Sequence, residues 1–537
     1  MKLRIDSWVN NMSKEKVFLF DTTLRDGQQT QGVDFSVQDK VRISKALDDL
    51  GIDYIEGGWP GANPTDTKFF EENLNFKNAK FTAFGMTKRS GRSADNDPQL
   101  RALLDTDSES VCLVAKTWDF HVDLALGISL DENIDAIKES VDAVKSSNKE
   151  SIIDCEHFFD GFKSNTDFSL KCIESAIESG SKWVVLCDTN GGTLPNEVFE
   201  IVEEVTKRFS GEQIGIHCHN DTENAVANSL AAIDAGARQL QGTINGLGER
   251  CGNANLISLI PTFLLKKQYS ENYDISIKEN KLKDLKTLSR LVDDILNKHP
   301  NNHQPYVGDN AFAHKGGLHV SAVMKDPTTY EHVNPDLVGN NRKILVSNQA
   351  GKSNLLSRLE SIGMKIDSKD ERINKLLEIV KEKEFQGYSY DGAGASFEIL
   401  AKHVLDEVPD FFTVEDYQVT ISAEKKGKSL SKAKISINVD DRIINSEGEG
   451  NGPVNALDKA LRKDLGIYNS AVEDLILLDY KVRILDGGTE AITRVVIESS
   501  DSDNKSWFTV GISPNIVEAS FEALQDSINY KLMKSES

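Results

Sequence analysis

The sequence lacks several features that would restrict its class. No apolar run is long enough to cross a bilayer, and residues 1–16 contain no apolar core of a signal peptide, so we expect a cytoplasmic protein that spans no membrane. The net charge of -23 leaves no excess of lysine and arginine for a nucleic-acid partner. The six cysteines include no Cys-x-x-Cys pair, which favours reduced, mostly buried thiols over a disulfide framework.

A unit of one short apolar run and one amphipathic helical segment recurs along the first half of the chain. In the first unit a helix is expected to begin after Ser36, where Asp39 completes a capping box, and to end at Gly51. The apolar runs are 17–20, 54–56, 80–84, 110–115, 151–155, 183–187, 215–219 and 240–244. Eight such units in about 250 residues predict an α/β fold, a (β/α)8 TIM barrel. A doubly wound open sheet is the alternative.

Polar residues follow most of these runs, where the active site of a TIM barrel lies. The tripeptide His217-Cys218-His219 ends the seventh run. Side chains alternate along a strand, so the two imidazoles are expected on one face and Cys218 on the other. Together with Asp26 after the first run, they form a ligand set for a divalent ion such as Mg²⁺, Mn²⁺ or Zn²⁺. Taken alone, Asp26 reads as a turn residue and the histidine pair as structural.

Three segments carry a resemblance to a known family. They are DTTLRDGQQ at 21–29, HCHND at 217–221 and NGLGERCGNA at 245–254. In this order they resemble the metal-dependent Claisen-type barrels, which include isopropylmalate, homocitrate and citramalate synthases and the hydroxymethylglutaryl-CoA lyases. The similarity extends over essentially the whole chain. It implies Asp26, His217 and His219 as direct metal ligands and Asn253 as a weaker or water-mediated contact.

The same resemblance implies roles for residues that bind a 2-oxo acid. Arg25 resembles the arginine that binds this substrate and stabilises the alkoxide developing on its keto oxygen. Thr189 matches a position that binds the substrate carboxylate. Glu156 matches a catalytic glutamate, although by itself it could equally belong to an ion pair at the barrel rim.

The second substrate implied by the family is acetyl-CoA, whose methyl group must lose a proton to a base. His319 aligns with the family's catalytic histidine and Tyr330 with a tyrosine that assists it, and His314 is the alternative base. In relatives this segment reaches into the active site of the partner subunit. The resemblance therefore implies a homodimer with shared sites.

The second half of the chain changes character beyond Gly387. Residues 269–384 are expected to be helix-rich linker subdomains. Two half-buried strands are predicted from apolar residues at every second position, and helices are predicted at 453–465 and at 514–532, the latter capped by Ser513. The strand positions are 433, 435, 437 and 439, then 478, 480, 482 and 484. Two similar strand-strand-strand-helix units imply an α+β module with internal pseudo-symmetry.

The segment GNGPVNAL at 450–457 resembles the regulatory domain of isopropylmalate and citramalate synthases, where an end-product amino acid binds. Isoleucine is the effector that the resemblance implies, and a purely structural dimerisation module is the alternative. We therefore divide the chain into an N-terminal extension (1–15), a TIM-barrel catalytic domain (16–275), linker subdomains that contribute to the active site (276–387) and a C-terminal regulatory domain (388–537).

The segment EGGWPGANPTD at 56–66 looks most like the citramalate synthase branch, which implies pyruvate as acceptor and a place in isoleucine biosynthesis. Trp59 is expected to narrow the pocket towards the methyl group of pyruvate, with packing between strand and helix as the alternative. The runner-up activity is 2-isopropylmalate synthesis, with 2-oxoisovalerate as acceptor in leucine biosynthesis. A catalytically silent metabolite sensor and an aldol-type lyase are further alternatives.

Overall fold

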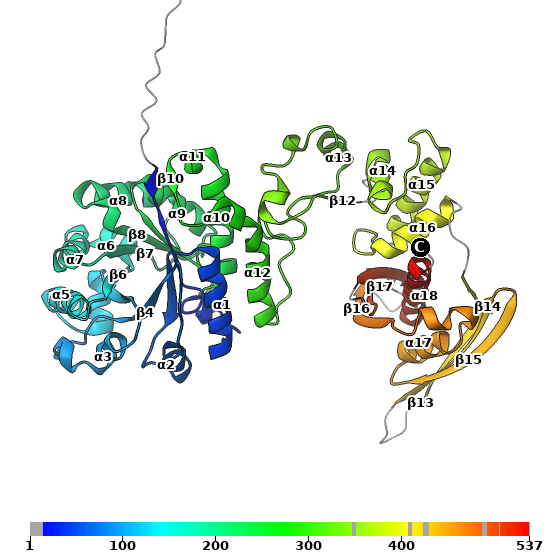
Figure 1. The fold of residues 1–537 in the computed structure, drawn as a ribbon, viewed down its shortest axis with the longest axis horizontal. Coiled ribbons are helices and arrows are strands. Elements are labelled where there is room, and N and C mark those ends of the chain that lie inside the picture. The colour runs from blue at the N-terminus through cyan, green and yellow to red at the C-terminus, as the bar shows by residue number, and fades with distance from the viewer. Residues whose placement is uncertain are drawn as a thin grey trace, which may run out of the picture. The chain divides into compact units, whose positions relative to one another are not determined.

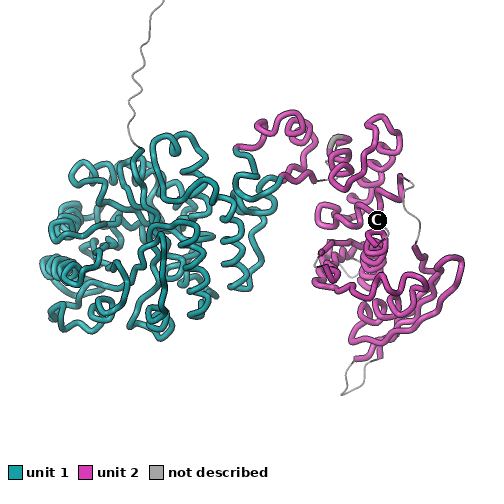
Figure 2. The backbone as a smooth tube through the Cα atoms, in the orientation of Figure 1, with its two compact units in different colours: residues 1–312, 333–341 teal, residues 313–332, 342–537 magenta. Residues whose placement is uncertain are grey.

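A computed structural model describes residues 14–345, 351–405, 411–422, 429–485, 491–503 and 505–535. The predicted N-terminal extension falls almost entirely on residues 1–13, which lie outside the described residues. The chain forms two compact units, shown in Figure 2. The first consists of residues 1–312 and 333–341, and the second of residues 313–332 and 342–537.

The first unit contains a closed barrel of eight parallel strands, which confirms the TIM-barrel prediction and excludes an open sheet (Figure 1). Neighbouring strands follow chain order, and the last pairs with the first. The strands are β2 (Phe18–Asp21), β3 (Tyr54–Gly58), β4 (Lys80–Met86), β5 (Ser110–Lys116), β6 (Glu150–Glu156), β7 (Trp183–Asp188), β8 (Ile214–Cys218) and β9 (Gln239–Gly242). A short parallel pair, β1 (Glu15–Lys16) with β10 (Tyr273–Asp274), connects the residues just before β2 with a segment that follows the last barrel strand.

Helices alternate with the barrel strands. The predicted capping box at the start of α1 (Val37–Leu50) is confirmed, since Ser36 and Asp39 bond reciprocally, and Gly51 ends the helix at a φ of 102°. The other large barrel helices are α2 (Pro64–Phe70), α3 (Pro98–Leu104), α5 (Leu130–Ser146), α7 (Thr166–Ser179), α8 (Pro195–Arg208), α9 (Ala225–Asp234) and α10 (Leu256–Leu265). Shorter or later helices are α4 (Asp119–His121), α6 (Phe158–Ser164), α11 (Lys267–Ser270) and α12 (Asp284–Ile295).

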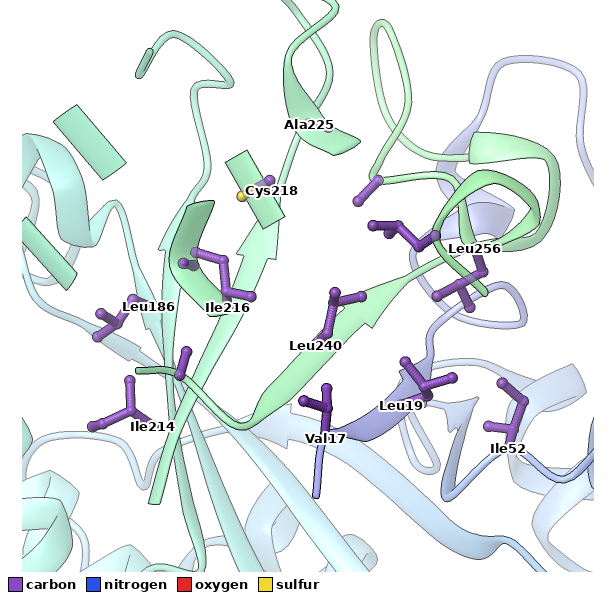
Figure 3. Close-up of a cluster of buried hydrophobic side chains, with 14 of the residues drawn as sticks. Val17, Leu19, Ile52, Leu186, Ile214, Ile216, Cys218, Ala225, Leu240 and Leu256 are labelled. Carbon is purple, nitrogen blue, oxygen red and sulfur yellow. The ribbon is translucent and has the colours of Figure 1, made fainter. Parts of the chain in front are cut away.

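Strand alternation divides the barrel side chains between two hydrophobic clusters. The outer cluster packs between strands and helices, and Figure 3 shows part of it. Its labelled members include Val17, Leu19, Leu186, Ile214, Ile216, Cys218, Leu240 and Leu256. The inner cluster fills the barrel and contains Phe20, Tyr54, Phe84, Cys112, Ile152, Trp183, Val185 and Cys187. Because Ile216 and Cys218 face outwards, His217 is directed into the barrel.

The second unit begins with a segment around α13 (Gly317–Val323). Its flanking strand β11 (Ala313–His314) pairs in parallel with β12 (Lys343–Ile344). Three helices follow, α14 (Lys352–Ser361), α15 (Glu371–Phe385) and α16 (Gly394–Val404), and they share a hydrophobic cluster of their own.

The remainder of the second unit contains two three-stranded antiparallel sheets, each followed by a helix, as the sequence predicts. The first repeat is β13 (Thr413–Ser422), β14 (Leu430–Val439), β15 (Arg442–Gly450) and α17 (Pro453–Lys463). The second is β16 (Ile476–Ile484), β17 (Thr493–Ser500), β18 (Ser506–Ser513) and α18 (Ile516–Ser535). The alternation predicted on β14 is confirmed, because Ala433, Ile435, Ile437 and Val439 are all buried.

The strand predicted at 478–484 is confirmed as β16, but the prediction that its apolar side chains are half-buried is wrong. Leu478, Val482 and Ile484 are 56%, 42% and 65% exposed, although they alternate as a half-buried strand would. The reason is topological: β16 lies at the edge of its sheet and α18 packs on β17 and β18.

The helix α18 begins two residues later than predicted, at Ile516, where the Asn515 side chain accepts the N–H of Val517.

The structure bears on two expectations from the sequence, the state of the cysteines and the presence of membrane-spanning helices. Five cysteines are buried and Cys251 is exposed, and all six are free thiols, as expected. In the described part of the chain, no helix combines the length and the apolar character needed to cross a membrane.

Candidate active site

A cavity of about 480 Å³ opens at the carboxyl ends of the barrel strands. Every barrel strand contributes a lining residue from its end or from the loop that follows it. The lining contains acidic, basic, aromatic and aliphatic side chains. It includes Arg25, Asp26, Trp59, Phe84, Met86, Val114, Lys116, Asp154, Glu156, Thr189, His217, His219 and Arg250. The cavity therefore brings together all the site residues predicted from the barrel half except Asn253. Asn253 does not line the cavity, but its side chain contacts Asp26, which does.

Asp26, His217 and His219 form a buried cluster whose ligand atoms converge. Oδ2 of Asp26 lies 3.2 Å from Nε2 of His217 and 3.8 Å from Nε2 of His219. The two Nε2 atoms are 3.4 Å apart. Neighbouring ligands of a cation with bonds of about 2.1 Å are separated by about 3 Å, so these donors fit a divalent ion.

Hydrogen bonds and charge prepare these groups for a cation. The Nδ1 of His217 donates to Oε1 of Gln241 at 2.8 Å, which fixes the ring with Nε2 facing Oδ2 of Asp26. Burial and the neighbouring His217 ring lower the pKa of His219 to about 4, so that ring is neutral. Burial alone would raise the pKa of Asp26, but the Arg25 guanidinium and the hydrogen bond from His217 hold it well below its usual range.

Asn253 completes the cluster from the loop after β9. Its Nδ2 donates to Oδ2 of Asp26 at 2.6 Å and lies 3.3 Å from Nε2 of His217. Its Oδ1 is buried against Gly248 and has no hydrogen-bond partner among the described residues, so the amide nitrogen is the atom that faces the cluster. A Cβ at Gly248 would lie 1.9 Å from this Oδ1, so only glycine allows the amide to sit there.

Arg25 is fixed on two sides. Its guanidinium lies 3.8 Å above the ring centroid of Phe84, and its Nε donates to Oε2 of Glu56 at 2.7 Å. Nη1 is 3.4 Å from Oδ1 of Asp26. An arginine that stacks on a ring and pairs with two carboxylates is rigid, and it presents a fixed positive charge beside the cluster.

Trp59 forms the apolar wall of the cavity together with Phe84. The two rings meet edge to face, with centroids 5.7 Å apart and an angle of 84°. Asp66 fixes this segment, because its Oδ2 accepts the backbone N–H of Trp59 at 2.9 Å. A Cβ at Gly58 would lie 2.5 Å from Cγ of Asp66, so the close approach requires glycine.

The Asp66 carboxylate is neutralised by Lys40, which is fully buried. The Lys40 ammonium also donates to the carbonyl oxygens of Leu24 and Gly57 at 2.8 and 3.0 Å. It thus joins the loop after β2 to the segment that presents Trp59.

We expect Lys40→Met to destabilise the barrel by about 3–5 kcal/mol, because it leaves the Asp66 carboxylate buried without its counter-charge. Differential scanning calorimetry should show a lower thermal midpoint for the barrel transition. Lys45→Met, at an exposed position of the same helix, is the matched control and should leave the midpoint unchanged. An unchanged midpoint in Lys40→Met would contradict the role assigned to this ion pair.

Glu156 and Thr189 lie on adjacent strand ends. The Glu156 carboxylate pairs with Lys116, so the ion pair considered as an alternative is present, and the carboxylate also lines the cavity. Oγ1 of Thr189 accepts the backbone N–H of His157 at 2.8 Å. The two side chains therefore face the same space as the metal-type cluster.

His319 and Tyr330 belong to the second unit. Their rings stack with centroids 4.0 Å apart, and both side chains are exposed. His314, the alternative base, is buried instead, and its Nε2 lies 3.2 Å from Oε1 of Glu331, which also binds Arg342. The structure therefore gives His314 a structural partner and leaves His319 accessible.

Comparisons with known proteins decide the family. The family described as HMGL-like matches residues 16–292, Homocitrate synthase post-HMGL domain-like matches 306–387, and LeuA allosteric (dimerisation) domain matches 392–532. The (R)-citramalate synthase of Aquifex aeolicus is 50% identical and that of Geobacter sulfurreducens 48%, each covering 97% of this chain and 99% and 98% of the relative. This chain belongs to the (R)-citramalate synthase family.

Isopropylmalate synthases are more distant relatives. A probable 2-isopropylmalate synthase of Methanopyrus kandleri is 30% identical over 96% of this chain and 98% of its own length. The resemblance of segment 56–66 to the citramalate synthase branch thus agrees with similarity over the full length.

Several residues of this citramalate synthase-type site were not predicted. Asp154 and Gln241 lie inside the barrel, where Nε2 of Gln241 donates to Oδ1 of Asp154 at 3.0 Å. Burial and the Glu56 carboxylate raise the pKa of Asp154 to about 6. The sequence signal that could have identified Asp154 is a polar residue at an inward-facing position of an otherwise apolar strand. His121, beside Glu156, carried no comparable signal because its contact depends on folding.

Proposed function

We propose that this chain condenses acetyl-CoA with pyruvate and hydrolyses the thioester to give citramalate and CoA. The observation that carries this proposal is the Asp26, His217 and His219 cluster, which opens into a cavity closed on its apolar side by Trp59 and Phe84. The chain's similarity to citramalate synthases over their full length supports the same reaction.

Asp26, His217 and His219 are the residues that would hold a divalent ion, with Asn253 as a weaker contact. When bound, such an ion supplies a Lewis acid that polarises the keto carbonyl of a 2-oxo acid. Mg²⁺, Mn²⁺ and Zn²⁺ are all compatible with this ligand set.

The cavity's own side chains would bind and orient the acceptor. Arg25 stabilises the negative charge that develops on the keto oxygen, because its guanidinium is held in place before the reaction. Thr189 binds the substrate carboxylate. Glu156, directed into the same space, exchanges protons with the reacting groups.

His319 is the base that removes a proton from the methyl group of acetyl-CoA, and Tyr330 orients its ring by stacking. Leu318 and Met324, beside them, are 84% and 54% exposed, which is typical of a surface covered in an assembly. We therefore place His319 in the active site of a partner subunit, in a homodimer. The exposed apolar residues of β16 support dimerisation of the C-terminal module.

We expect Trp59→Ala to widen acceptor specificity. Each additional methylene in an apolar pocket is worth about 1–3 kcal/mol, so kcat/KM for 2-oxoisovalerate relative to pyruvate should rise by about 10- to 100-fold. Thiol release from acetyl-CoA with each acceptor measures this ratio.

Phe199→Ala is the matched control, because Phe199 is an aromatic residue on the outer helix α8 and does not line the cavity. It should leave the ratio at the wild-type value. An unchanged ratio in Trp59→Ala would show that Trp59 packs between strand and helix without limiting the size of the acceptor side chain.

A panel of 2-oxo acids tests the proposed function. Pyruvate should give the highest kcat/KM for acetyl-CoA-dependent thiol release. A preference for 2-oxoisovalerate would instead indicate 2-isopropylmalate synthesis, turnover without acetyl-CoA an aldol-type lyase, and no turnover a silent sensor.

The C-terminal module supports regulation by an amino acid. We propose isoleucine as the effector, because citramalate formation is the entry to a threonine-independent isoleucine route. Adding isoleucine to the pyruvate assay should inhibit thiol release, and leucine at the same concentration should not.

A further inference from the structure

Arg250 lines the cavity but belongs neither to the metal cluster nor to the substrate contacts described above. Its backbone adopts a φ of 57°, in the left-handed region that residues other than glycine rarely occupy. Such a conformation persists where the surroundings fix it, and it is often found at functional sites. The contacts of the Arg250 guanidinium show what it holds in place.

One guanidinium joins the loops that follow three successive barrel strands. Nε and Nη2 of Arg250, after β9, donate to Oδ1 and Oδ2 of Asp221, after β8, each at 2.8 Å. Nη2 also donates to the backbone carbonyl oxygen of Thr189, directly after β7, at 2.7 Å. Two parallel hydrogen bonds fix the plane of a guanidinium, so the direction of the bond to Thr189 is fixed as well.

The loops after β7 and β8 also meet directly. A Cβ at Gly191, whose φ is 62°, would collide with the Asp221 carboxylate. Oγ1 of Thr222 donates to the backbone carbonyl oxygen of Gly191 at 3.0 Å. The Asp221 carboxylate is thus fixed against the loop that carries Thr189, and it holds Arg250 in register with that loop.

Thr189 is held at two oxygen atoms. Its carbonyl oxygen accepts from Arg250, and its Oγ1 accepts the backbone N–H of His157 at 2.8 Å. A hydroxyl that accepts one hydrogen bond still has its own proton to donate. Because Thr189 lines the cavity, that proton is available to an anionic group bound there.

We propose that Arg250 is a positioning residue, which holds Thr189 where its hydroxyl binds the carboxylate of the 2-oxo acid. This inference rests on the proposed function, which gives Thr189 that role. Arg250 acts through Thr189 and Asp221 and does not contact the substrate. The remaining nitrogen, Nη1, lies 4.0 Å from Oε2 of Glu249.

A role limited to folding stability would give a different result. The side chains of Arg250 and Asp221 are 41% and 23% exposed, and ion pairs at such positions contribute little to stability. Loss of the pair should therefore leave the thermal midpoint close to that of the wild type. Its effect should appear in the affinity for the acceptor.

Arg250→Lys tests the positioning role, because one ammonium nitrogen cannot make the paired bonds to Asp221 and reach the Thr189 carbonyl as well. The Kd and KM for pyruvate should both rise by about 10-fold, as for one lost hydrogen bond to a charged group. The kcat should change by less than about twofold, since substrate binding alone is weakened. Titration of the Mn²⁺-loaded protein with pyruvate, followed by tryptophan fluorescence, gives Kd without acetyl-CoA.

A double-mutant cycle shows whether Arg250 acts through Thr189. Thr189→Val keeps the shape of the side chain without its hydroxyl, and should raise the Kd for pyruvate by about 10- to 100-fold. In that background Arg250→Lys should raise Kd by less than about twofold further, because the group that it positions is already absent. Asp221→Asn weakens the same pair and should resemble Arg250→Lys.

The outcomes separate positioning from other roles. Independent effects of Arg250→Lys and Thr189→Val on Kd would show that Arg250 binds the substrate itself, and would overturn the inference. Weaker Mn²⁺ binding in Arg250→Lys would assign the residue to the metal cluster and would also overturn it. A wild-type Kd for pyruvate in Arg250→Lys would overturn it while leaving the proposed function intact.

Failure of the proposed function would be recognised separately. A wild-type protein that binds pyruvate but releases no thiol would overturn that function, and the Kd values of the cycle would still decide the role of Arg250. A wild-type protein that does not bind pyruvate would overturn both. Arg101→Lys, at an exposed arginine of α3 that pairs with Asp105, is the control and should match the wild type in every assay.

Discussion

His217→Ala should bind a divalent ion at least about 100-fold more weakly than the wild type and lose detectable condensation activity, since loss of even an outer partner of a metal ligand costs about 10- to 100-fold. His217 lies 3.2 Å from Asp26 and 3.4 Å from His219, so its removal leaves two donors where three converge. Calorimetric titration of the metal-free protein with Mn²⁺ measures the affinity, and thiol release measures the activity.

A graded variant sharpens this expectation. Gln241→Leu removes the hydrogen bond that fixes the His217 ring and should weaken binding by about 10-fold, less than loss of the ligand itself. His303→Ala is the control, because His303 is an exposed histidine that does not line the cavity, and it should bind Mn²⁺ as the wild type does. Equal Mn²⁺ affinity in His217→Ala and the wild type would show that the cluster is structural.

Arg25→Lys should lower kcat by about 100- to 1,000-fold, the usual cost of removing one group that stabilises a developing oxyanion. A lysine ammonium cannot stack on Phe84, bond Glu56 and face the cavity at once, whereas the guanidinium does so with separate edges. Steady-state kinetics with pyruvate give kcat, and Mn²⁺ titration shows that the metal-type cluster is retained.

Arg101→Lys provides the matched control, because Arg101 is a half-exposed arginine on α3 that pairs with Asp105 one helical turn away. It should leave kcat unchanged. A kcat within about threefold of the wild type in Arg25→Lys would exclude a direct role for the guanidinium in stabilising the oxyanion.

Much of the barrel could be predicted because its determinants are local in sequence. The alternation Ile214, Ile216 and Cys218 fixes which face of β8 is apolar, and therefore directs His217 inwards. The capping box at Ser36 and the glycine at 51 are equally local signals. The boundaries proposed for the domains, and the roles assigned to individual site residues, stay predictions.

The features that sequence reasoning missed depend on long-range packing. The apolar positions of β16 read as half-buried, but burial is decided by where α18 packs, and the edge strand is left uncovered in a single chain. The Gln241–Asp154 contact joins residues 87 positions apart, and His121 meets Glu156 only when neighbouring strand ends meet. No local pattern encodes these contacts.

The most direct test of the account follows the carbonyl carbon of the acceptor. With purified protein, Mn²⁺, acetyl-CoA and pyruvate isotopically labelled at its carbonyl carbon, NMR should show this carbon becoming the quaternary, hydroxyl-bearing carbon of citramalate. Free CoA should appear in equal amount. If labelled pyruvate stays unchanged while 2-oxoisovalerate is consumed under the same conditions, the assignment of this cavity to citramalate formation is contradicted.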